Sequence, residues 1–599
     1  MNSYVLTFTI GPVQGFIASA RRSRDLWAGS WLLSELAKAV AKNLHDKGAE
    51  LIFPYVENPD DLQPESEFSV GNKIQVVVQA ENAAQLTEIA NQAKAATNAH
   101  FIQIADKVWD NLSHYHNDLR QEIWEKQKND YVEVQYAWAR ISNDNGDNKA
   151  YLNASQKAAQ LLAARKATRD FTQQTGDFLP KSSLDGARET VLLEEKNISK
   201  TLRNKLGLSQ SEQLDCVGVV KRLCGTPEQF TPITRVAADD WLNEIKVHEN
   251  FALVKKAYKS LVESELATRV LGNKGIYDDF PYDAQFCYSS RLNAALVKAD
   301  EKTYRLLIDL QAALKPIWRE FGEPCPYFAM LLADGDRMGE LLDKAETQEN
   351  HQDISQNLSV FAQFVPKIMR ENRAQYIYAG GDDVLGLASL NNAVKSAKML
   401  KDQFSDSLKT ISAQLGAETP TLSVGLAICH IQNPLGNIRS LAKRAEKIAK
   451  GDNAPQPRNA LGITLAVRSG SISDMRWRWD DKKAQRYFKY WIKCYKSHKL
   501  SSRVAYDCRD IFMRTDFPPN EMNEKEQADL LGKIRFAEMK RMLDKAQTSL
   551  GKPLDKITKA ILMCRFDALN GDLNALATEL IIARWLAAKT QRDLGRENG

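Results

Sequence analysis

Three aspartates in two glycine-containing motifs have the residue types and the spacing for metal chemistry. Asp334 opens an Asp-Gly-Asp motif, and Asp382 and Asp383 close a Gly-Gly-Asp-Asp motif. Carboxylate oxygens are the ligands that Mg²⁺ or Mn²⁺ prefers. Two such ions, held by these three aspartates, would activate a 3′-hydroxyl and stabilise a leaving pyrophosphate in a phosphoryl transfer.

Glycines beside the aspartates leave room for a nucleotide. Gly380 and Gly381 permit a tight turn, and together with Gly335 they let a triphosphate approach the backbone closely. Either motif alone is equally well explained as an ordinary turn, since Gly and Asp are the commonest turn residues. The two motifs lie about 48 residues apart, and an apolar run leads into each. This pairing favours a nucleotidyl-transfer site.

The segments around the motifs predict how the motifs meet. The hydrophobic pattern predicts, in order, a strand at 327–333, a helix at 351–370, strands at 375–379 and 384–387, a helix at 391–414, a strand at 422–429, a helix at 438–450 and a strand at 460–467. The first six elements follow the βαββαβ order of a ferredoxin-like sheet, in which the first and third strands are neighbours about 4.8 Å apart. Asp334, Asp382 and Asp383 should therefore converge at one end of the central strand pair.

An earlier part of the chain has a compatible order of elements. The pattern predicts strands at 4–10, 73–78 and 131–141 and helices at 26–44 and 83–117. The loops at 11–15 and 70–72 correspond in position to the two acidic motifs but contain no carboxylate. This indicates a degenerate internal duplication whose first copy binds no metal. We expect this copy to support a second nucleotide, with the loop at 11–15 facing Gly380 and Gly381 across a cleft.

Length and composition indicate a multidomain globular protein. The chain has 599 residues, of which 43% are hydrophobic and 26% charged, and this excludes a disordered or collagen-like chain. We predict an α+β protein with domains at 1–195, 196–315, 316–470 and 471–599, the second and fourth of them helical, and no strand after Gly470. No apolar run is long enough to span a membrane, and the N-terminus lacks the basic region of a secretory signal, so we expect a cytoplasmic protein.

The distribution of charge and cysteine bears on partners and metals. Residues 471–599 contain 26 Lys and Arg against 18 Asp and Glu, so we expect an anionic partner for this part of the chain. Eight scattered cysteines exclude a disulfide scaffold. Cys216 and Cys224 lack a second close pair, so buried thiols are a better interpretation than a zinc site.

The segment 476–509 mixes eleven Lys and Arg with eight aromatic residues. Such a mixture can neutralise phosphates and stack bases, which favours contact with RNA. On an amphipathic helix, however, the aromatic residues more often form the buried face and the cations the exposed one. The sequence leaves both interpretations open.

Several motifs resemble one known family. The segments 334–339, 378–385, 11–17 and 24–30 are similar to those of the large polymerase-cyclase subunit of type III-B (Cmr-type) CRISPR effector complexes, and 180–186 and 235–239 also fit. The resemblance implies two ferredoxin-like palm domains, a helical domain between them and a C-terminal helical bundle. It also implies an activity, the polymerisation of ATP into cyclic oligoadenylate second messengers once the complex has bound target RNA. The implied partners are the other subunits of the complex, crRNA and target RNA.

A further element resembles the end of nucleotide cyclase domains. Ala449-Lys450 followed by Arg458-Asn459 is similar to the element whose cations hold nucleotide phosphates in that superfamily. The resemblance implies that Lys450, Arg458 and Asn459 bind the nucleotide, although residues 451–457 form an insertion between the two pieces. Alternatively, Lys450 is a helix C-terminal cation that offsets the helix dipole.

Many members of this family carry an N-terminal HD-type nuclease, and we expect none here because the first palm begins at residue 1. The single His-Asp pair, His45-Asp46, has no second pair at metal-ligand spacing, and we interpret it as a solvated helix end. The leading function is a metal-dependent cyclic oligoadenylate synthase without DNA cleavage. The alternatives are a catalytically silent scaffold for the crRNA-bound subunits and a free-standing cyclase that makes a dinucleotide. The presence of all three aspartates favours the first.

Overall fold

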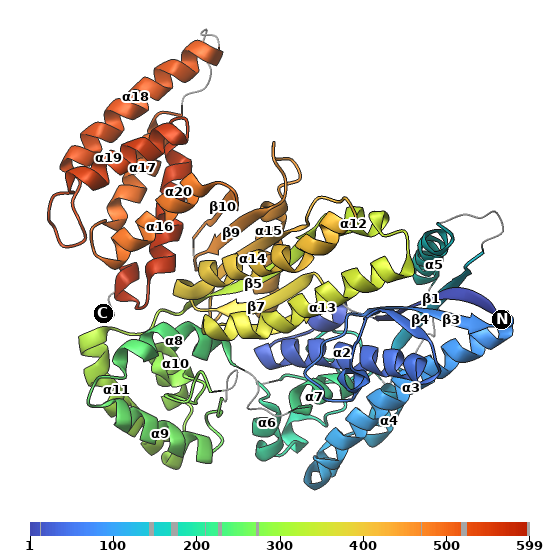
Figure 1. The fold of residues 1–599 in the computed structure, drawn as a ribbon. Helices are drawn as coiled ribbons and strands as arrows, with labels where there is room; N and C mark the ends of the chain where they lie inside the picture. Colours follow the sequence, from blue (N-terminus) through green and yellow to red (C-terminus); the bar gives the residue numbers. More distant parts are fainter. Residues whose placement is uncertain are drawn as a thin grey trace.

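The structure is a computed structural model that describes residues 1–11, 14–142, 149–168, 178–209, 211–225, 231–270, 275–468, 470–516 and 524–595. It contains two β-sheets, each covered by helices, a helical region between the sheet domains and a helical region at the C-terminus (Figure 1). The α+β class predicted from the sequence is confirmed. None of the helices within these ranges has both the length and the apolar character that a membrane crossing requires.

The first sheet has four antiparallel strands in the order β2-β3-β1-β4. The strands are β1 (Asn2–Gly11), β2 (Glu50–Phe53), β3 (Lys73–Ala80) and β4 (Glu133–Arg140). Helices α2 (Ser23–Asp46) and α3 (Ala83–Asp110) pack on one face, and α5 (Ala150–Ala167) packs on the other. We call this unit the first palm domain. β2 escapes prediction from the sequence, because four residues are too few to show an alternating pattern.

The second sheet has six strands in the order β10-β9-β8-β5-β7-β6. The strands are β5 (Tyr327–Asp336), β6 (Gln375–Gly380), β7 (Asp383–Ala388), β8 (Thr421–His430), β9 (Ala460–Ala466) and β10 (Ile472–Arg478). β8 and β9 run parallel, and the other neighbours are antiparallel. β5 lies between β7 and β8, so the predicted pairing of the first and third strands is confirmed. We call this unit the second palm domain.

β10 corrects the prediction that no strand follows Gly470. It pairs antiparallel with β9 and extends the second sheet by one strand. Met475 and Trp477 alternate as buried residues, but the neighbouring charged residues Asp474 and Arg476 obscure this pattern in the sequence. The pairing satisfies the backbone hydrogen-bonding groups along the edge of β9, a long-range contact that the local sequence does not reveal.

Helices cover both faces of the second sheet. α13 (Gln348–Glu371) and α14 (Leu390–Gln414) pack against the face that includes Leu331 of β5. α15 (Leu435–Lys450) packs against the opposite face, which includes Met330. Since successive residues of a strand point to opposite faces, Asp334 points to the same side as Met330 and therefore towards α15.

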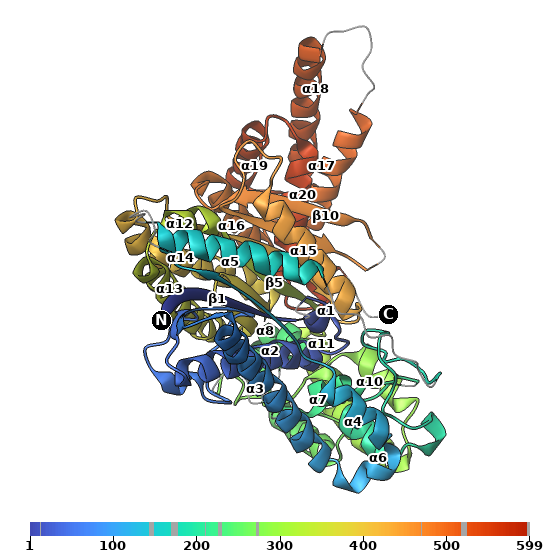
Figure 2. The ribbon, with the colours of Figure 1, turned by 90° about the vertical axis from the view of Figure 1, so that its right-hand side faces the viewer.

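The remaining helices form two regions and a few short connections. The region between the palm domains contains α6 (Lys200–Leu206), α7 (Cys216–Leu223), α8 (Ile233–Ile245), α9 (Phe251–Glu263), α10 (Ser289–Leu296) and α11 (Glu301–Phe321). The C-terminal region contains α16 (Lys482–Lys496), α17 (Ser502–Arg514), α18 (Glu524–Lys545), α19 (Lys556–Ala568) and α20 (Leu573–Ala587). The short helices are α1 (Gln14–Ala18), α4 (Gln121–Asn129) and α12 (Met338–Lys344). α20 packs on β10 and α14, while α17 and α18 project away from the palm domains (Figure 2).

Direct contacts hold the two palm domains together. α13 of the second domain lies along β2 of the first, where the side chain of Gln352 donates to the carbonyl of Leu51 at 3.0 Å. The backbone N–H of Tyr55 donates to the hydroxyl of Ser355 at 2.9 Å. In this arrangement the end of β1 and the loop before β3 lie opposite the ends of β5 and β7.

Candidate active site

Asp334 and Asp383 lie side by side on neighbouring strands. Asp334 is near the end of β5 and Asp383 begins β7, next to the register pair formed by Ala333 and Val384. The two carboxyl groups are close enough for Asp334 to raise the pKa of Asp383. Both residues line a cleft of about 770 Å³ between the palm domains. The structure therefore brings these two predicted site residues together.

Asp382 lies behind this pair, and glycines shape the turn around it. A Cβ atom added to Gly335 would come within 2.8 Å of the Cβ of Asp382, so Asp382 packs directly on the end of β5. Gly381 has a φ of 72°, a conformation that favours glycine. The hydroxyl of Tyr378 fills the space beside Gly380 that a side chain would need. These contacts make the Gly-Gly-Asp-Asp hairpin tight.

Burial and repulsion raise the pKa of both hairpin aspartates. Burial raises the pKa of Asp382 to about 6, and the nearby charge of Asp334 adds to the shift. Burial also raises the pKa of Asp383, and the neighbouring carboxyl group of Asp334 and the charge of Asp382 raise it further. A divalent cation beside these carboxylates would relieve the repulsion.

The donor set fits a metal ion that arrives with a nucleotide. Within the described ranges, no group of three or more His, Cys, Asp or Glu side chains forms a ready metal cage. Mg²⁺ in nucleotide enzymes is commonly held by one or two carboxylates together with substrate phosphates. Asp334 and Asp383 supply such a pair, and Asp382 lies close behind them.

Lys450 supplies positive charge next to Asp334. Its ammonium group forms ion pairs with Asp334 and, at 2.8 Å, with Glu446. Burial lowers the pKa of Lys450, but the hydrogen bonds to Asp334 and Glu446 outweigh this effect and raise the pKa overall. α15 ends at Lys450, and Gly451 follows in the left-handed conformation of a helix cap. Lys450 is thus both a helix C-terminal cation and a residue that lines the cleft.

Two strand glycines let α15 lie directly on the sheet. A Cβ atom at Gly425 of β8 would come within 2.2 Å of the backbone nitrogen of Glu446. A Cβ atom at Gly462 of β9 would come within 2.2 Å of the carbonyl oxygen of Ala445. A glycine inside a strand often marks such a close backbone approach, so this signal was available in the sequence. The contact sets the position from which Glu446 and Lys450 reach Asp334.

Arg458 and Asn459 lie next to Asp336, which is the second aspartate of the Asp-Gly-Asp motif. The fully buried carboxylate of Asp336 accepts hydrogen bonds from Thr421, from Ser423 and, at 3.0 Å, from the backbone N–H of Asn459. A guanidinium nitrogen of Arg458 lies 3.8 Å from the same carboxylate. A direct role of Arg458 and Asn459 in holding phosphate stays a prediction.

Lys450 and Arg458, the two halves of the element that resembles nucleotide cyclases, lie next to each other despite the insertion between them. The backbone N–H of Arg458 donates to the carbonyl oxygen of Lys450 at 2.6 Å, so residues 451–457 form a closed loop. Arg458 and Asn459 both have positive φ angles, of 65° and 46°. The bonds to Asp336 hold this backbone in place.

Sequence reasoning missed other residues that line the cleft. α15 contributes Arg439, Lys443, Glu446 and Lys450 to the lining of the cleft. These residues follow one another at intervals of four, three and four positions. Residues at this spacing share one helix face, and that pattern was the available signal. Lys166 of α5 also lines the cleft, with no signal in the local sequence.

The first palm domain forms the other wall of the cleft. Gly11, Val70, Asn72 and Glu133 line this wall. The backbone N–H of Ile10 donates to the carbonyl of Asn72 at 3.0 Å, which ties the two loops together. In the loop at 11–15, residues 12 and 13 lie outside the described residues. The end of β1 therefore lies across an intramolecular cleft from Asp334 and Asp383. Gly380 and Gly381 are not among the described residues that line this cleft, so the predicted facing of the loop at 11–15 and these two glycines stays a prediction.

Two minor sequence motifs lie away from this site. His45 and Asp46 are exposed at the end of α2, as expected for a solvated helix end. Cys216 and Cys224 are buried, and burial raises the pKa of the Cys224 thiol to about 12.

We expect the stability of the metal-free protein to depend on pH through Asp382. Its pKa is about 6 in the folded protein against an ordinary value of 3.8, so between these values the folded state holds a proton that the unfolded state has lost. The penalty for the buried charge is complete above about pH 6 and is absent below 3.8. In EDTA, the Tm difference between the Asp382→Asn, Asp383→Asn variant and the parent should shrink as the pH falls from about 7 to about 4.5. An equal difference at both pH values would contradict the assigned burial.

Two family models match the chain in the regions that form the two sheets. The model described as Cas10/Cmr2, second palm domain, matches residues 327–462. The model described as CRISPR-associated protein Cmr2, N-terminal, matches residues 5–106. The resemblance indicated by the motifs is thereby confirmed.

Comparison with individual proteins agrees with the family models. The CRISPR system Cmr subunit Cmr2 of Pyrococcus furiosus is 24% identical over an alignment of 554 residues. The matched region covers 79% of this chain and 63% of that protein. The chain thus spans less than two thirds of the length of this relative. A chain in the cryo-EM structure of type III-B Cmr-beta in the apo state superposes with a TM-score of 0.62 at 12% identity, over 95% of this chain and 82% of that chain. Type III-B Cmr-beta bound to cognate target RNA gives a TM-score of 0.61 at 13% identity, over 95% and 83%. These structures share the fold.

Proposed function

We propose that this chain, which is of the Cas10/Cmr2 type in both palm domains, polymerises ATP into cyclic oligoadenylates as the large subunit of a type III-B effector complex. The observation that carries the proposal is the pair Asp334 and Asp383, side by side on adjacent strands in a cleft between the two palm domains. Nucleotidyl transfer needs such carboxylates beside a triphosphate and an acceptor hydroxyl. ATP as the substrate rests on the family resemblance.

The residues around the cleft divide the chemical tasks. Asp334 and Asp383, supported by Asp382, would hold Mg²⁺ or Mn²⁺, which supplies the charge that activates a 3′-hydroxyl and stabilises the leaving pyrophosphate. Lys450 pairs with Asp334, and it could exchange this partner for a phosphate oxygen of a bound nucleotide. Lys443 lines the cleft about two turns of α15 before Lys450 and adds positive charge along the triphosphate path.

The first palm domain would serve as the platform for the acceptor nucleotide. Gly11 and Asn72 line the wall of the cleft that this domain forms. Both loops lack carboxylates, so one chain would contain one metal centre. Successive attacks by 3′-hydroxyl groups could then extend and close a ring within a single chain.

The proposed partners follow from the same resemblance. We propose that the chain assembles with the other subunits of a Cmr-type complex and encounters crRNA and target RNA within that complex. One of the structures that share this fold is type III-B Cmr-beta bound to cognate target RNA. This likeness supports the proposal through the fold, because its sequence identity is only 13%.

Incubating the purified complex with labelled ATP and Mg²⁺ tests the function, with and without target RNA. Oligoadenylate formed only with target RNA is the expected result. Product formed equally well without RNA would favour a free-standing cyclase. No product under either condition, from a complex that still binds target RNA, would favour a catalytically silent scaffold.

A further inference from the structure

A stripe of cations on α16 lies outside the proposed catalytic site. Residues 482–499 contain seven Lys and Arg and no Asp or Glu, and all seven cations are exposed. Five of them, at positions 482, 486, 489, 493 and 496, recur every three or four residues. At about 100° per residue they fall within an arc of about 80° on one side of the helix, along a length of about 21 Å. We call these five residues the α16 stripe.

The opposite side of α16 shows what the aromatic residues of this segment do. Phe488 and Trp491 are buried in the core that α16 shares with α20 and the second sheet. The ring of Trp477 in β10 lies 4.7 Å from that of Phe488. These aromatic side chains are therefore structural, and base stacking by them is excluded. The exposed groups that α16 offers to a partner are its cations, while Tyr487, Tyr490 and Tyr495 are half-buried. Tyr506 of the following helix α17 is exposed.

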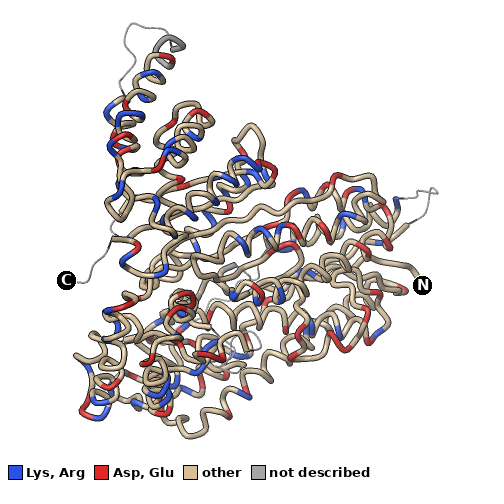
Figure 3. The backbone as a smooth tube through the Cα atoms, turned by 60° about the vertical axis from the view of Figure 1, so that its left-hand side comes forward, with Lys and Arg blue, Asp and Glu red and all other residues tan. Residues whose placement is uncertain are grey.

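Neighbouring helices pair their cations with nearby acids, and α16 does not. Over most of the molecule the two signs of charge are intermixed (Figure 3). The helices next in sequence contain local ion pairs, namely Arg503 with Asp507 and Arg514 with Asp510 in α17, and Lys533 with Asp529 in α18. In the part of the chain that the structure describes, no residue of the stripe forms an ion pair with a carboxylate. Like charges at this spacing repel and destabilise a helix, so an external polyanion would relieve the repulsion.

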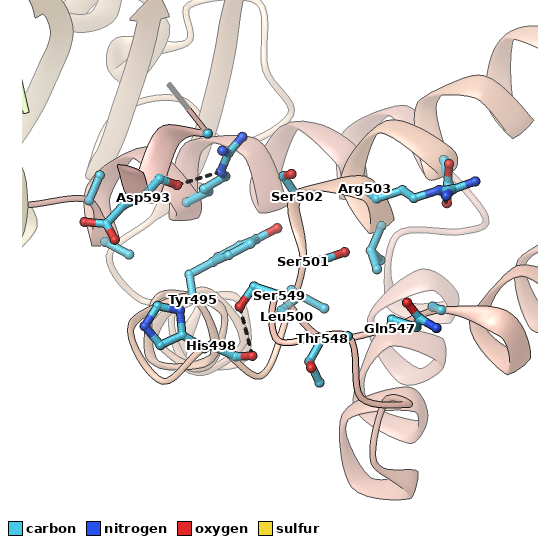
Figure 4. Close-up of a pocket in the computed structure, with 18 of the residues that line it drawn as sticks. Tyr495, His498, Leu500, Ser501, Ser502, Arg503, Gln547, Thr548, Ser549 and Asp593 are labelled. Atoms are coloured by element: carbon cyan, nitrogen blue, oxygen red, sulfur yellow. Dashed lines mark hydrogen bonds and ion pairs between the residues drawn. The ribbon is translucent and has the colours of Figure 1, made fainter. Parts of the chain in front are cut away.

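The stripe leads into a large cavity whose lining combines hydroxyl groups with charged side chains of both signs, among them Asp507, Asp510 and Glu538 and a larger number of Lys and Arg. Lys496, its last residue, lines a cavity of about 1450 Å³ between α17, α18 and α20. The side chains of Tyr495, Ser501, Ser502 and Thr548 line the same cavity (Figure 4). The buried hydroxyl of Tyr495 has no hydrogen-bond partner among the described residues, and its ring extends towards the loop that carries the two serines. Hydroxyl groups of this kind bind phosphates and sugars in nucleic-acid complexes.

We propose that the α16 stripe and this cavity bind single-stranded RNA, with phosphates along the stripe and ribose hydroxyls in the cavity. A straight row of cations about 5 Å apart along a helix matches a linear polyanion and tracks one strand. An acidic protein partner would also need an apolar centre to its interface. Between residues 482 and 499 the described chain exposes no large hydrophobic side chain. The hydroxyl groups in the cavity favour RNA over DNA, because only RNA carries the 2′-hydroxyl.

Fluorescence anisotropy of the full chain with a labelled single-stranded RNA of mixed sequence tests this proposal. The variant Arg486→Glu, Lys489→Glu, Lys493→Glu should bind the RNA at least about tenfold more weakly than the parent. Its plot of log affinity against log salt concentration should have a slope smaller by about 2, since each lost phosphate contact removes about 0.7. The control variant Lys94→Glu, Lys126→Glu, Lys256→Glu changes three exposed lysines on α3, α4 and α9 by the same charge and should bind like the parent.

Further variants and a DNA strand separate an effect on RNA binding from effects on folding and on catalysis. If circular dichroism shows that the glutamate variant is unfolded, the corresponding triple glutamine variant replaces it. This variant should also bind the RNA more weakly than the parent. Asp383→Asn should bind RNA like the parent, because the stripe lies outside the catalytic cleft. Parental affinity in a folded stripe variant would overturn the proposal and leave an acidic protein as the partner to be sought. Equal affinity for a DNA strand of the same sequence would overturn the assignment of ribose hydroxyls to the cavity.

Discussion

Replacing Asp382 and Asp383 together with Asn should abolish nucleotide polymerisation and leave the fold intact. The change removes two charges from a hairpin turn and takes no side chain from the hydrophobic core of the domain. Loss of metal binding removes several kcal/mol of transition-state stabilisation, which corresponds to a rate at least about a thousandfold lower. Conversion of labelled ATP by the assembled complex, with target RNA present, measures the effect.

Two comparisons sharpen this test. Asp353→Asn with Asp406→Asn removes two exposed aspartates from α13 and α14 and should keep the parental rate. The single variant Asp383→Asn should reproduce most of the loss, because Asp383 lines the cleft whereas Asp382 packs against Gly335. Parental turnover in the double variant at saturating Mg²⁺ would show that the metal is held elsewhere.

Replacing Gly462 with Ala should lower the rate by on the order of a hundredfold, because a displacement of about 1 Å at a positioned group has that cost. The new Cβ would lie 2.2 Å from the carbonyl of Ala445 and 2.6 Å from the backbone nitrogen of Ala449, so α15 must move off the sheet. Lys450 then loses its place beside Asp334. Overpacking of this kind also lowers the free energy of unfolding by about 1–3 kcal/mol. Single-turnover rates at saturating ATP, measured well below the Tm, separate the two effects.

Gly436 provides the matched control on the same helix. It lies in the first turn of α15, and nothing comes within 4 Å of a Cβ atom built there. Gly436→Ala should keep the parental rate and should raise stability slightly, because Ala is the better helix former. A parental rate in Gly462→Ala would show that the position of α15 does not govern catalysis.

Local patterns in the sequence are sufficient to predict the strands that present the acidic motifs. The apolar runs at 327–333 and 384–387 are short, and an aspartate marks one end of each, Asp334 after the first and Asp383 before the second, so they predict β5 and β7 without knowledge of their neighbours. The βαββαβ order then makes these two strands adjacent, because the ferredoxin-like topology places the first strand beside the third. The proximity of Asp334 and Asp383 follows from these two local facts.

Other features of the site depend on long-range contacts that local patterns do not encode. Asp382 follows the same glycines as Asp383, and only the packing of its Cβ against Gly335 sets it behind the pair. β10 exists as a strand because β9 offers it an open edge. The cleft exists because the first palm domain packs on the second through α13 and β2.

The same division holds for the C-terminal region. The spacing of cations and aromatic residues makes α16 amphipathic in the sequence, but it leaves open which of the two sets meets a partner. The structure decides this, because α20 and the second sheet bury Phe488 and Trp491 and leave the α16 stripe exposed. Burial depends on which distant element packs against a helix, and that contact is made only when the whole chain folds.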